Sequence, residues 1–149
     1  MTHVFTYGSL MFERVWSRVV RGTYPAASAT LSGYRRQCVL GQDYPSLEQI
    51  AGSDGDSNDA LGGVVYLGVE ADDLAALDEF EGSEYLRIQV QVTVRAQVEG
   101  GPVSGSLLPA DTYLFIASDK VAPGPWDPVE FERERIERFL REYPPPRRA

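Results

Sequence analysis

Three acidic residues crowd the end of a predicted helix. The stretch LDEFEGSEYLR, residues 77–87, follows DDLAAL, and Gly82 is placed to end the helix, so Asp78, Glu79 and Glu81 fall in its last turn. The open carbonyl groups of a helix C-terminus repel anions, by roughly 0.3–1 kcal/mol for each exposed charge. Acids in this position therefore suggest a purpose other than solubility.

A helical projection separates these acids. With about 100° per residue, Leu77 and Phe80 mark the apolar face, and Glu81 falls within it. Asp78 lies at the edge of that face, and Glu79 points away from it. An inward carboxylate has a raised pKa unless it is paired, and such a group is typical of a general acid/base.

Two structural alternatives for Glu81 stay open. The helix could end before Phe80, which would turn Glu81 toward water, or Glu81 could form an ion pair with Arg87. Both would leave the acid without a catalytic role.

The second candidate site is TYGSLM, residues 6–11, between a predicted strand, HVFTY, and a predicted helix, MFERVWSRVVR. Gly8 would allow a ligand close to the main chain, and Ser9 could cap the helix. Free N–H groups at such a turn, with the helix dipole, suit a carboxylate or phosphate. The alternative is a plain turn with a cap. The glycines and lysine of a nucleotide-binding P-loop are missing.

Other constellations are weak. DGDSND, residues 54–59, starts like a calcium loop but has Asp59 where glycine is needed and Val65 where glutamate is needed. Cys38 and His3, each the only residue of its kind, would form a nucleophile and base or a zinc site only by long-range coincidence. We therefore expect no metal and no cofactor.

Composition limits the partners. The chain has 149 residues, 43% of them hydrophobic, and a formal net charge of −8. This length suits one domain, expected over residues 1–143, with a disordered Pro/Arg tail at 144–149. The acidic balance disfavours nucleic acid and anionic membranes, and no stretch reaches the roughly 20 apolar residues of a membrane span. A lone cysteine and no leader favour a cytoplasmic protein, and no motif for a protein partner is readable.

The remaining pattern predicts an α+β fold, with a small mixed, mostly antiparallel β-barrel flanked by helices. Residues 88–98 alternate strictly between apolar and polar side chains, as in a long half-buried strand that could form a hairpin with TYLFIA. Further strands are expected in ATLSGYRRQCVL, bent near Gly33, in YPSLEQI and in GGVVYLGV, with a polar loop over GSDGDSND. Several late strands follow one another without a helix, which disfavours a parallel doubly wound sheet.

A last helix is predicted from WDPVEF. Asp127 can cap it, Pro128 suits its first position, and Glu130 has the spacing of a capping box. Trp126 and Phe131 have the spacing of a hydrophobic staple. The apolar stripe of this helix would be Ile136, Phe139, Leu140 and Tyr143.

Taken together, VFTYGSLM at 4–11, GGVVYLGV at 62–69 and LDEFEGSEYLR at 77–87 resemble the gamma-glutamyl cyclotransferase-like superfamily, in the order and approximate spacing of its members. LDEFEG resembles the branch that acts on γ-glutamyl amines, whereas LSGYRRQCVL resembles the branch that degrades glutathione. The leaving group therefore stays open.

The resemblance implies a small barrel, no cofactor, and a reaction in which the substrate's own α-amine attacks its γ-carbonyl and releases 5-oxoproline. It also implies that Glu81 is the general acid/base and that Tyr113, on the TYLFIA strand, lines the pocket. The glutamyl group would be bound by Tyr7, Gly8, Ser9 and Leu10. Two alternatives remain: a non-catalytic module that binds a γ-glutamyl or amino-acid ligand, and an amidohydrolase that uses Glu81 to activate water.

Overall fold

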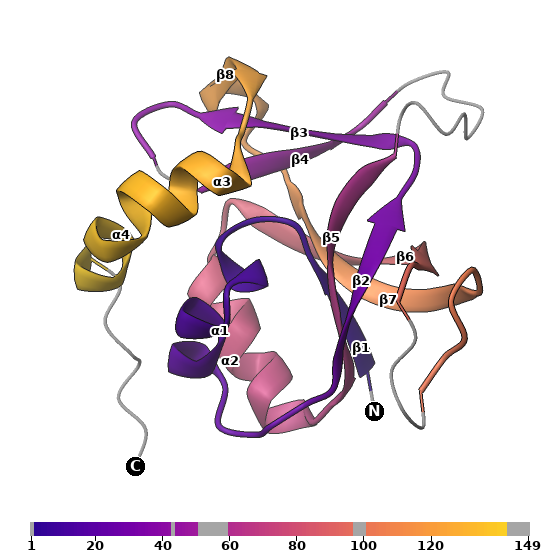
Figure 1. The fold of residues 1–149 in the computed structure, drawn as a ribbon. Coiled ribbons are helices and arrows are strands. Elements are labelled where there is room, and N and C mark those ends of the chain that lie inside the picture. Colours follow the sequence, from indigo (N-terminus) through magenta and orange to yellow (C-terminus); the bar gives the residue numbers. More distant parts are fainter. Residues whose placement is uncertain (1, 43, 51–59, 97–100, 143–149) are drawn as a thin grey trace.

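Five strands close into a barrel in the order β1-β5-β2-β6-β7, and a separate three-stranded sheet has the order β4-β3-β8 (Figure 1). The computed structural model describes residues 2–42, 44–50, 60–96 and 101–142. The strands are β1 (Thr2–Thr6), β2 (Ala26–Leu31), β3 (Tyr34–Val39), β4 (Pro45–Gln49), β5 (Leu61–Val69), β6 (Tyr85–Val94), β7 (Leu107–Phe115) and β8 (Val121–Pro125). The helical segments are η1 (Ser9–Met11), α1 (Glu13–Val19), α2 (Ala71–Glu81), η3 (Ser118–Lys120), α3 (Pro128–Glu130), the π-helical η4 (Phe131–Arg135) and α4 (Ile136–Glu142).

This architecture confirms the predicted α+β barrel of mixed, mostly antiparallel strands. The hairpin of β6 and β7 is confirmed in continuous antiparallel register from Tyr85 opposite Phe115 to Thr93 opposite Leu107. A parallel pairing between β1 and β7, the one such pairing among the described strands, closes the barrel with Val4 opposite Asp111.

Strands β1 and β5 are covered on both faces. Phe5 and Val65 belong to the core inside the barrel, whereas Val4 and Tyr66 belong to a second core that includes side chains of α1, α2 and the C-terminal helices. Figure 1 shows α1 and α2 side by side next to these strands. Burial on both faces explains why β5, LGGVVYLGV, has no polar side chain outside its tyrosine hydroxyl.

The C-terminal helix begins as predicted. The Asp127 side chain accepts a hydrogen bond from the Val129 N–H, and Pro128 occupies the first turn. The rings of Trp126 and Phe131 lie 5.3 Å apart, which fits the predicted staple. Glu130 pairs instead with Arg135, at 2.8 Å, and shows no capping box. Of the predicted stripe, Ile136, Phe139 and Leu140 are buried, and Tyr143 lies outside the described residues.

Several strand predictions need correction. Gly33 does not bend one strand but separates two, β2 in the barrel and β3 in the second sheet, and its φ of 82° suits glycine. The alternating strand stops at Val94, and Ala96 is exposed rather than inward. Strand β8 was not predicted, because its VAPGP sequence holds residues that sheets disfavour. Three predictions lie outside the described residues: Val98, the acidic 52–59 loop and the 144–149 tail.

Two adjacent glycines of β5 should respond very differently to substitution by alanine. A Cβ atom on Gly63 would lie 2.2 Å from the Thr6 carbonyl oxygen and 2.7 Å from the Phe5 ring, whereas a Cβ on Gly62 meets no atom within 4 Å. We expect Gly63→Ala to lower the free energy of unfolding by about 2–4 kcal/mol, because overpacking forces β1 away from β5. Gly62→Ala, measured by the same urea titration, should change it by no more than about 0.5 kcal/mol. Equal stability of the two variants would contradict the tight packing at Gly63.

Candidate active site

The turn after β1 carries the predicted binding segment. Tyr7 and Gly8 leave the strand, and Ser9–Met11 form the short 3-10 turn η1 ahead of α1. Ser9 does not cap a helix as predicted: Gly8 is the N-cap of η1, Phe12 is the N-cap of α1, and neither makes a side-chain cap hydrogen bond. A turn this short has only a small dipole, so the predicted binding of an anion would depend on its individual N–H groups.

The N–H groups of this turn are buried and available as hydrogen-bond donors. Gly8, Ser9 and Leu10 are buried, and within the described part of the chain no group accepts a hydrogen bond from their amides. Buried N–H donors are nearly always paired with protein, water or ligand. The turn therefore offers donors to a bound molecule.

Gly8 is required by its close neighbour in the second sheet. A Cβ atom at this position would lie 2.7 Å from the ring of Pro45, which begins β4 in the second sheet. The second sheet therefore presses the turn against the barrel, and only glycine fits between them.

Helix α2 places the predicted acid at the opposite wall. It runs from Ala71 to Glu81 and ends at Gly82, whose φ of 78° stops the helix as expected. Leu77 is fully buried, Glu81 is half-buried and Glu79 is exposed, as the projection predicted. Glu81 therefore does not swing into water.

One pocket brings the predicted residues together. Its cavity volume is about 20 Å³, within about 310 Å³ of empty space that includes its opening to solvent, and it lies between β1, the η1 turn, the end of α2 and strands β4, β6 and β7. All six predicted site residues line it: Tyr7, Gly8, Ser9, Leu10, Glu81 and Tyr113. The remaining lining residues are Phe5, Thr6, Pro45 and Tyr85. Proximity is thereby shown, while the individual roles stay predictions.

The pocket changes the acidity of Glu81. Burial, followed by the negative charge of Asp78, raises the pKa of Glu81 from 4.5 to about 8. Glu81 is therefore about half-ionised near pH 8, where it can both take and return a proton. Burial also raises the pKa of Tyr7, Tyr85 and Tyr113, so these phenols stay neutral.

Tyrosines connect the turn to the opposite strands. The Tyr7 hydroxyl donates to the Tyr113 carbonyl at 2.5 Å, and the Tyr85 hydroxyl donates to the Pro45 carbonyl at 2.7 Å. Both bonds join segments that are distant in the sequence, so the walls of the pocket hold one another in place.

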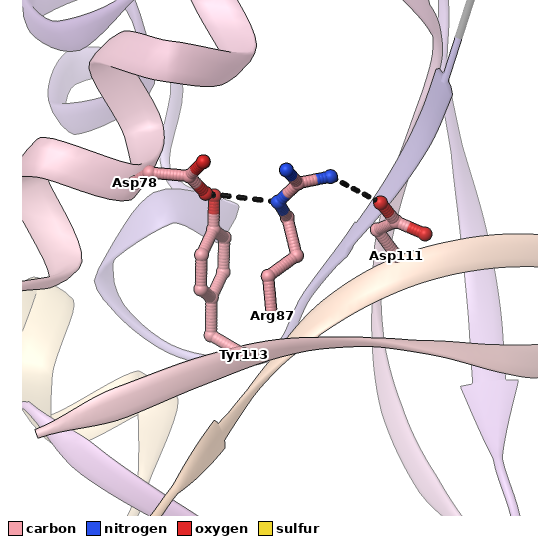
Figure 2. A network of polar contacts seen from close by, with 4 residues as sticks. All are labelled: Asp78, Arg87, Asp111 and Tyr113. Atoms are coloured by element: carbon pink, nitrogen blue, oxygen red, sulfur yellow. Dashed lines mark hydrogen bonds and ion pairs between the residues drawn. The ribbon is translucent and has the colours of Figure 1, made fainter.

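A chain of polar contacts runs beside the pocket (Figure 2). The Tyr113 hydroxyl donates to Asp78 Oδ1 at 2.7 Å, Arg87 Nε lies 2.9 Å from the same oxygen, and Arg87 Nη1 lies 2.7 Å from Asp111 Oδ2. The suggested pairing of Arg87 with Glu81 is therefore wrong, because Arg87 binds Asp78 and Asp111 instead.

Sequence reasoning missed three residues at the site. Pro45 and Tyr85 line the pocket, and Arg36 donates through Nη1 to the Tyr7 carbonyl at 2.8 Å while stacking over the Trp126 ring. Arg36 and Pro45 come from the second sheet, whose position over the turn had no signal in the sequence. Tyr85 could have been noticed because it follows Glu81 closely within LDEFEGSEYLR.

The weaker constellations gain no support. His3 lies on β1 of the barrel, where its Nδ1 accepts from the Gly68 N–H, while Cys38 lies on β3 of the other sheet. Across residues 2–42, 44–50, 60–96 and 101–142, no three His, Cys, Asp or Glu side chains are grouped to hold a metal. The DGDSND segment lies outside these residues. No helix in the same ranges has the length and apolar character to cross a membrane.

The raised pKa predicts a stability cost that depends on pH. Between about pH 4.5 and 8 the folded protein holds a proton on Glu81 that the unfolded chain releases, so the free energy of unfolding falls as pH rises through this window. We expect Glu81→Gln to be near neutral at pH 4 and to stabilise the protein by up to about 5 kcal/mol above pH 8. Urea titrations across this range measure the difference.

Glu79→Gln is the matched control for this experiment. Glu79 lies on the same helix but is exposed, so its substitution should shift stability by no more than about 0.5 kcal/mol at any pH. A Glu81→Gln effect that does not vary with pH would show that the Glu81 carboxyl is not desolvated.

Comparisons with known proteins agree on a family. A family model described as "Gamma-glutamyl cyclotransferase, AIG2-like" matches residues 4–128. AIG2-like protein D of Arabidopsis thaliana is 33% identical over 142 residues, which cover 95% of this chain and 86% of that protein.

Solved structures have the same fold. The solution structure of an Arabidopsis thaliana protein superposes with a TM-score of 0.64 at 28% identity and covers 95% of this chain and 87% of its own. A gamma-glutamyl cyclotransferase from yeast that is specific to glutathione has a TM-score of 0.58 at 15% identity, covering 97% and 89%. The second likeness is evidence for the fold alone.

Proposed function

Because the chain belongs to the gamma-glutamyl cyclotransferase, AIG2-like family, we propose that it converts a small γ-glutamyl amine or peptide into 5-oxoproline and a free amine or amino acid. The observation that carries this proposal is the enclosure of Glu81, with a pKa near 8, in one pocket with the Tyr7–Leu10 turn. No nucleic acid or membrane takes part in this proposal. The lone Cys38 suits a reducing compartment, and we propose the cytoplasm.

The reaction is an intramolecular acyl transfer. The α-amine nitrogen of the substrate forms a bond to its own γ-carbonyl carbon, the γ-amide C–N bond breaks, and the leaving nitrogen gains a proton. The nucleophile is tethered to its electrophile, so the protein has to fold the substrate into an attack conformation and move protons.

Glu81 is suited to the proton transfers. Ionised Glu81 takes a proton from the α-ammonium group, which leaves a neutral amine to attack, and it then returns this proton to the leaving nitrogen. The attacking nitrogen loses a second proton as it becomes the lactam N–H, and this proton also goes to the departing amine, which leaves as an ammonium ion. The pKa of an α-ammonium group in peptides is about 7.7–8.0, close to that of Glu81. An ordinary glutamate at 4.5 would make the first transfer uphill by about 5 kcal/mol. Burial of Glu81 removes most of this barrier.

The η1 turn is suited to the anionic parts of the substrate. The uncommitted amides of Gly8, Ser9 and Leu10 can bind the α-carboxylate or the oxyanion that develops on the γ-carbonyl oxygen. Arg36, bonded to the Tyr7 carbonyl, adds a positive charge behind the turn. These donors and this charge support binding of the glutamyl end of the substrate at the turn.

A defined substrate panel tests the reaction. We expect the purified protein to release 5-oxoproline from at least one of a set of γ-glutamyl amines, γ-glutamyl dipeptides and glutathione, identified by mass spectrometry. Glu81→Gln should lower kcat/KM by about 10²–10⁴-fold, because it removes the acid/base, and Glu79→Gln should leave it unchanged.

The same panel separates the alternatives. Release of glutamate without 5-oxoproline would favour an amidohydrolase that uses Glu81 to activate water. Saturable binding of a γ-glutamyl ligand by calorimetry without any turnover would favour a binding module. Full activity in a well-folded Glu81→Gln protein would contradict the role of Glu81 even if 5-oxoproline forms.

A further inference from the structure

Asp78 occupies a special place relative to Glu81. It lies three residues earlier on α2, so the two carboxyl groups project from the same side of the last turn. Its Oδ1 atom receives two hydrogen bonds, from the Tyr113 hydroxyl at 2.7 Å and from Arg87 Nε at 2.9 Å. Asp78 therefore joins the helix that carries Glu81 to the hairpin that carries Tyr113.

The hairpin fixes the other end of this contact. Arg87 on β6 lies directly opposite Tyr113 on β7, and Asp111 lies two residues along β7. Arg87 Nη1 binds Asp111 at 2.7 Å while its Nε binds Asp78, so the planar guanidinium group is held at two points (Figure 2). This geometry leaves the Asp78 carboxylate little freedom.

Stability alone is a weak reason for this arrangement. The side chains of Asp78 and Arg87 are 43% and 35% exposed, and ion pairs this accessible contribute roughly 0–1 kcal/mol. Asp78 also sits at a helix C-terminus, where its charge is unfavourable. A role toward the pocket accounts better for an acid in this position.

Tyr113 links Asp78 to the pocket. Tyr113 is only 4% exposed, lines the pocket with Glu81, and donates a hydrogen bond from its hydroxyl group to Asp78. A phenolic oxygen that donates its proton retains lone pairs, and across the described residues no group donates to this oxygen. The Tyr113 oxygen therefore keeps acceptor capacity for a donor that reaches it from the pocket that Tyr113 lines, such as a substrate amine.

Resting on the proposed cyclisation, we propose that Asp78 is a positioning residue that acts through Tyr113: held by Arg87, it accepts the hydrogen bond of the Tyr113 hydroxyl and so presents the lone pairs of the phenolic oxygen to the substrate's α-amine beside Glu81. The amine then has two acceptors, Tyr113 to orient it and Glu81 to take its proton. Asp78 itself does not touch the substrate.

The charge of Asp78 gives this role a second signature. The titratable groups that face Glu81 are Asp78 from α2, Tyr7 from the turn, Tyr85 from β6 and Tyr113 from β7, with Arg36, Glu84 and Arg87 behind them. After burial, the negative charge of Asp78 is the second cause of the raised pKa of Glu81. Removing this charge should let Glu81 ionise at lower pH.

A double-mutant cycle tests the action through Tyr113. Asp78→Ala and Tyr113→Phe should each lower kcat/KM for 5-oxoproline release by about 10–100-fold, because each removes one partner of a charge-assisted hydrogen bond. The double variant should lose no more than the worse single variant, since both act on the same oxygen. Losses that multiply would overturn the proposal. If Asp78→Ala does not fold, Arg87→Gln takes its place in the cycle, with the same expectation.

The pH profile tests the charge. Asp78→Asn keeps an acceptor for Tyr113 but removes the anion, so the acid limb of kcat/KM should move to lower pH while Glu79→Gln leaves it in place. An unmoved acid limb in Asp78→Asn would overturn the electrostatic part of the proposal. If the unmodified protein releases no 5-oxoproline, the proposed function fails first, and the inference fails with it.

Discussion

The position of β1 is the constraint on which the site depends. This strand pairs antiparallel with β5 and parallel with β7, so it closes the barrel, and it runs directly into the Tyr7–Leu10 turn. Its backbone register with β7 has a single residue pair, Val4 with Asp111. Buried side chains extend this seam, because Thr112 donates to the Phe5 carbonyl and Tyr7 donates to the Tyr113 carbonyl. The contacts that close the barrel therefore also position the turn that lines the pocket.

The second sheet completes what the barrel begins. Pro45 lies against Gly8, and Arg36 binds the carbonyl of Tyr7, so one face of the turn is fixed by strands that do not belong to the barrel. The other face opens onto Glu81. Desolvating this acid costs stability above its ordinary pKa, and the packing of β1, β5 and α2 has to offset that cost. In the proposed reaction, the same desolvation matches Glu81 to the amine from which it takes a proton.

Local patterns predicted much of the fold. The apolar face of α2 identified Glu81 as the inward acid, Asp127 capped the last helix as expected, and alternation revealed β6 up to Val94. Predictions failed where the answer depended on distant residues. Gly33 separates two strands because β3 pairs with β4 and β8 in the second sheet. Arg87 does not pair with Glu81 because it binds Asp78 and Asp111 at two points.

The sequence by itself determined most of the elements, the motif order that identifies the family, and the direction in which Glu81 projects from its helix. These follow from side-chain periodicity and backbone preferences, which act over a few residues. Only the tertiary structure decided that β4 covers the turn, that Tyr85 lines the pocket, and that Asp78 binds Tyr113 rather than water. Such contacts join residues 35 or more positions apart, and their geometry is fixed by how the sheets pack, which local patterns do not encode.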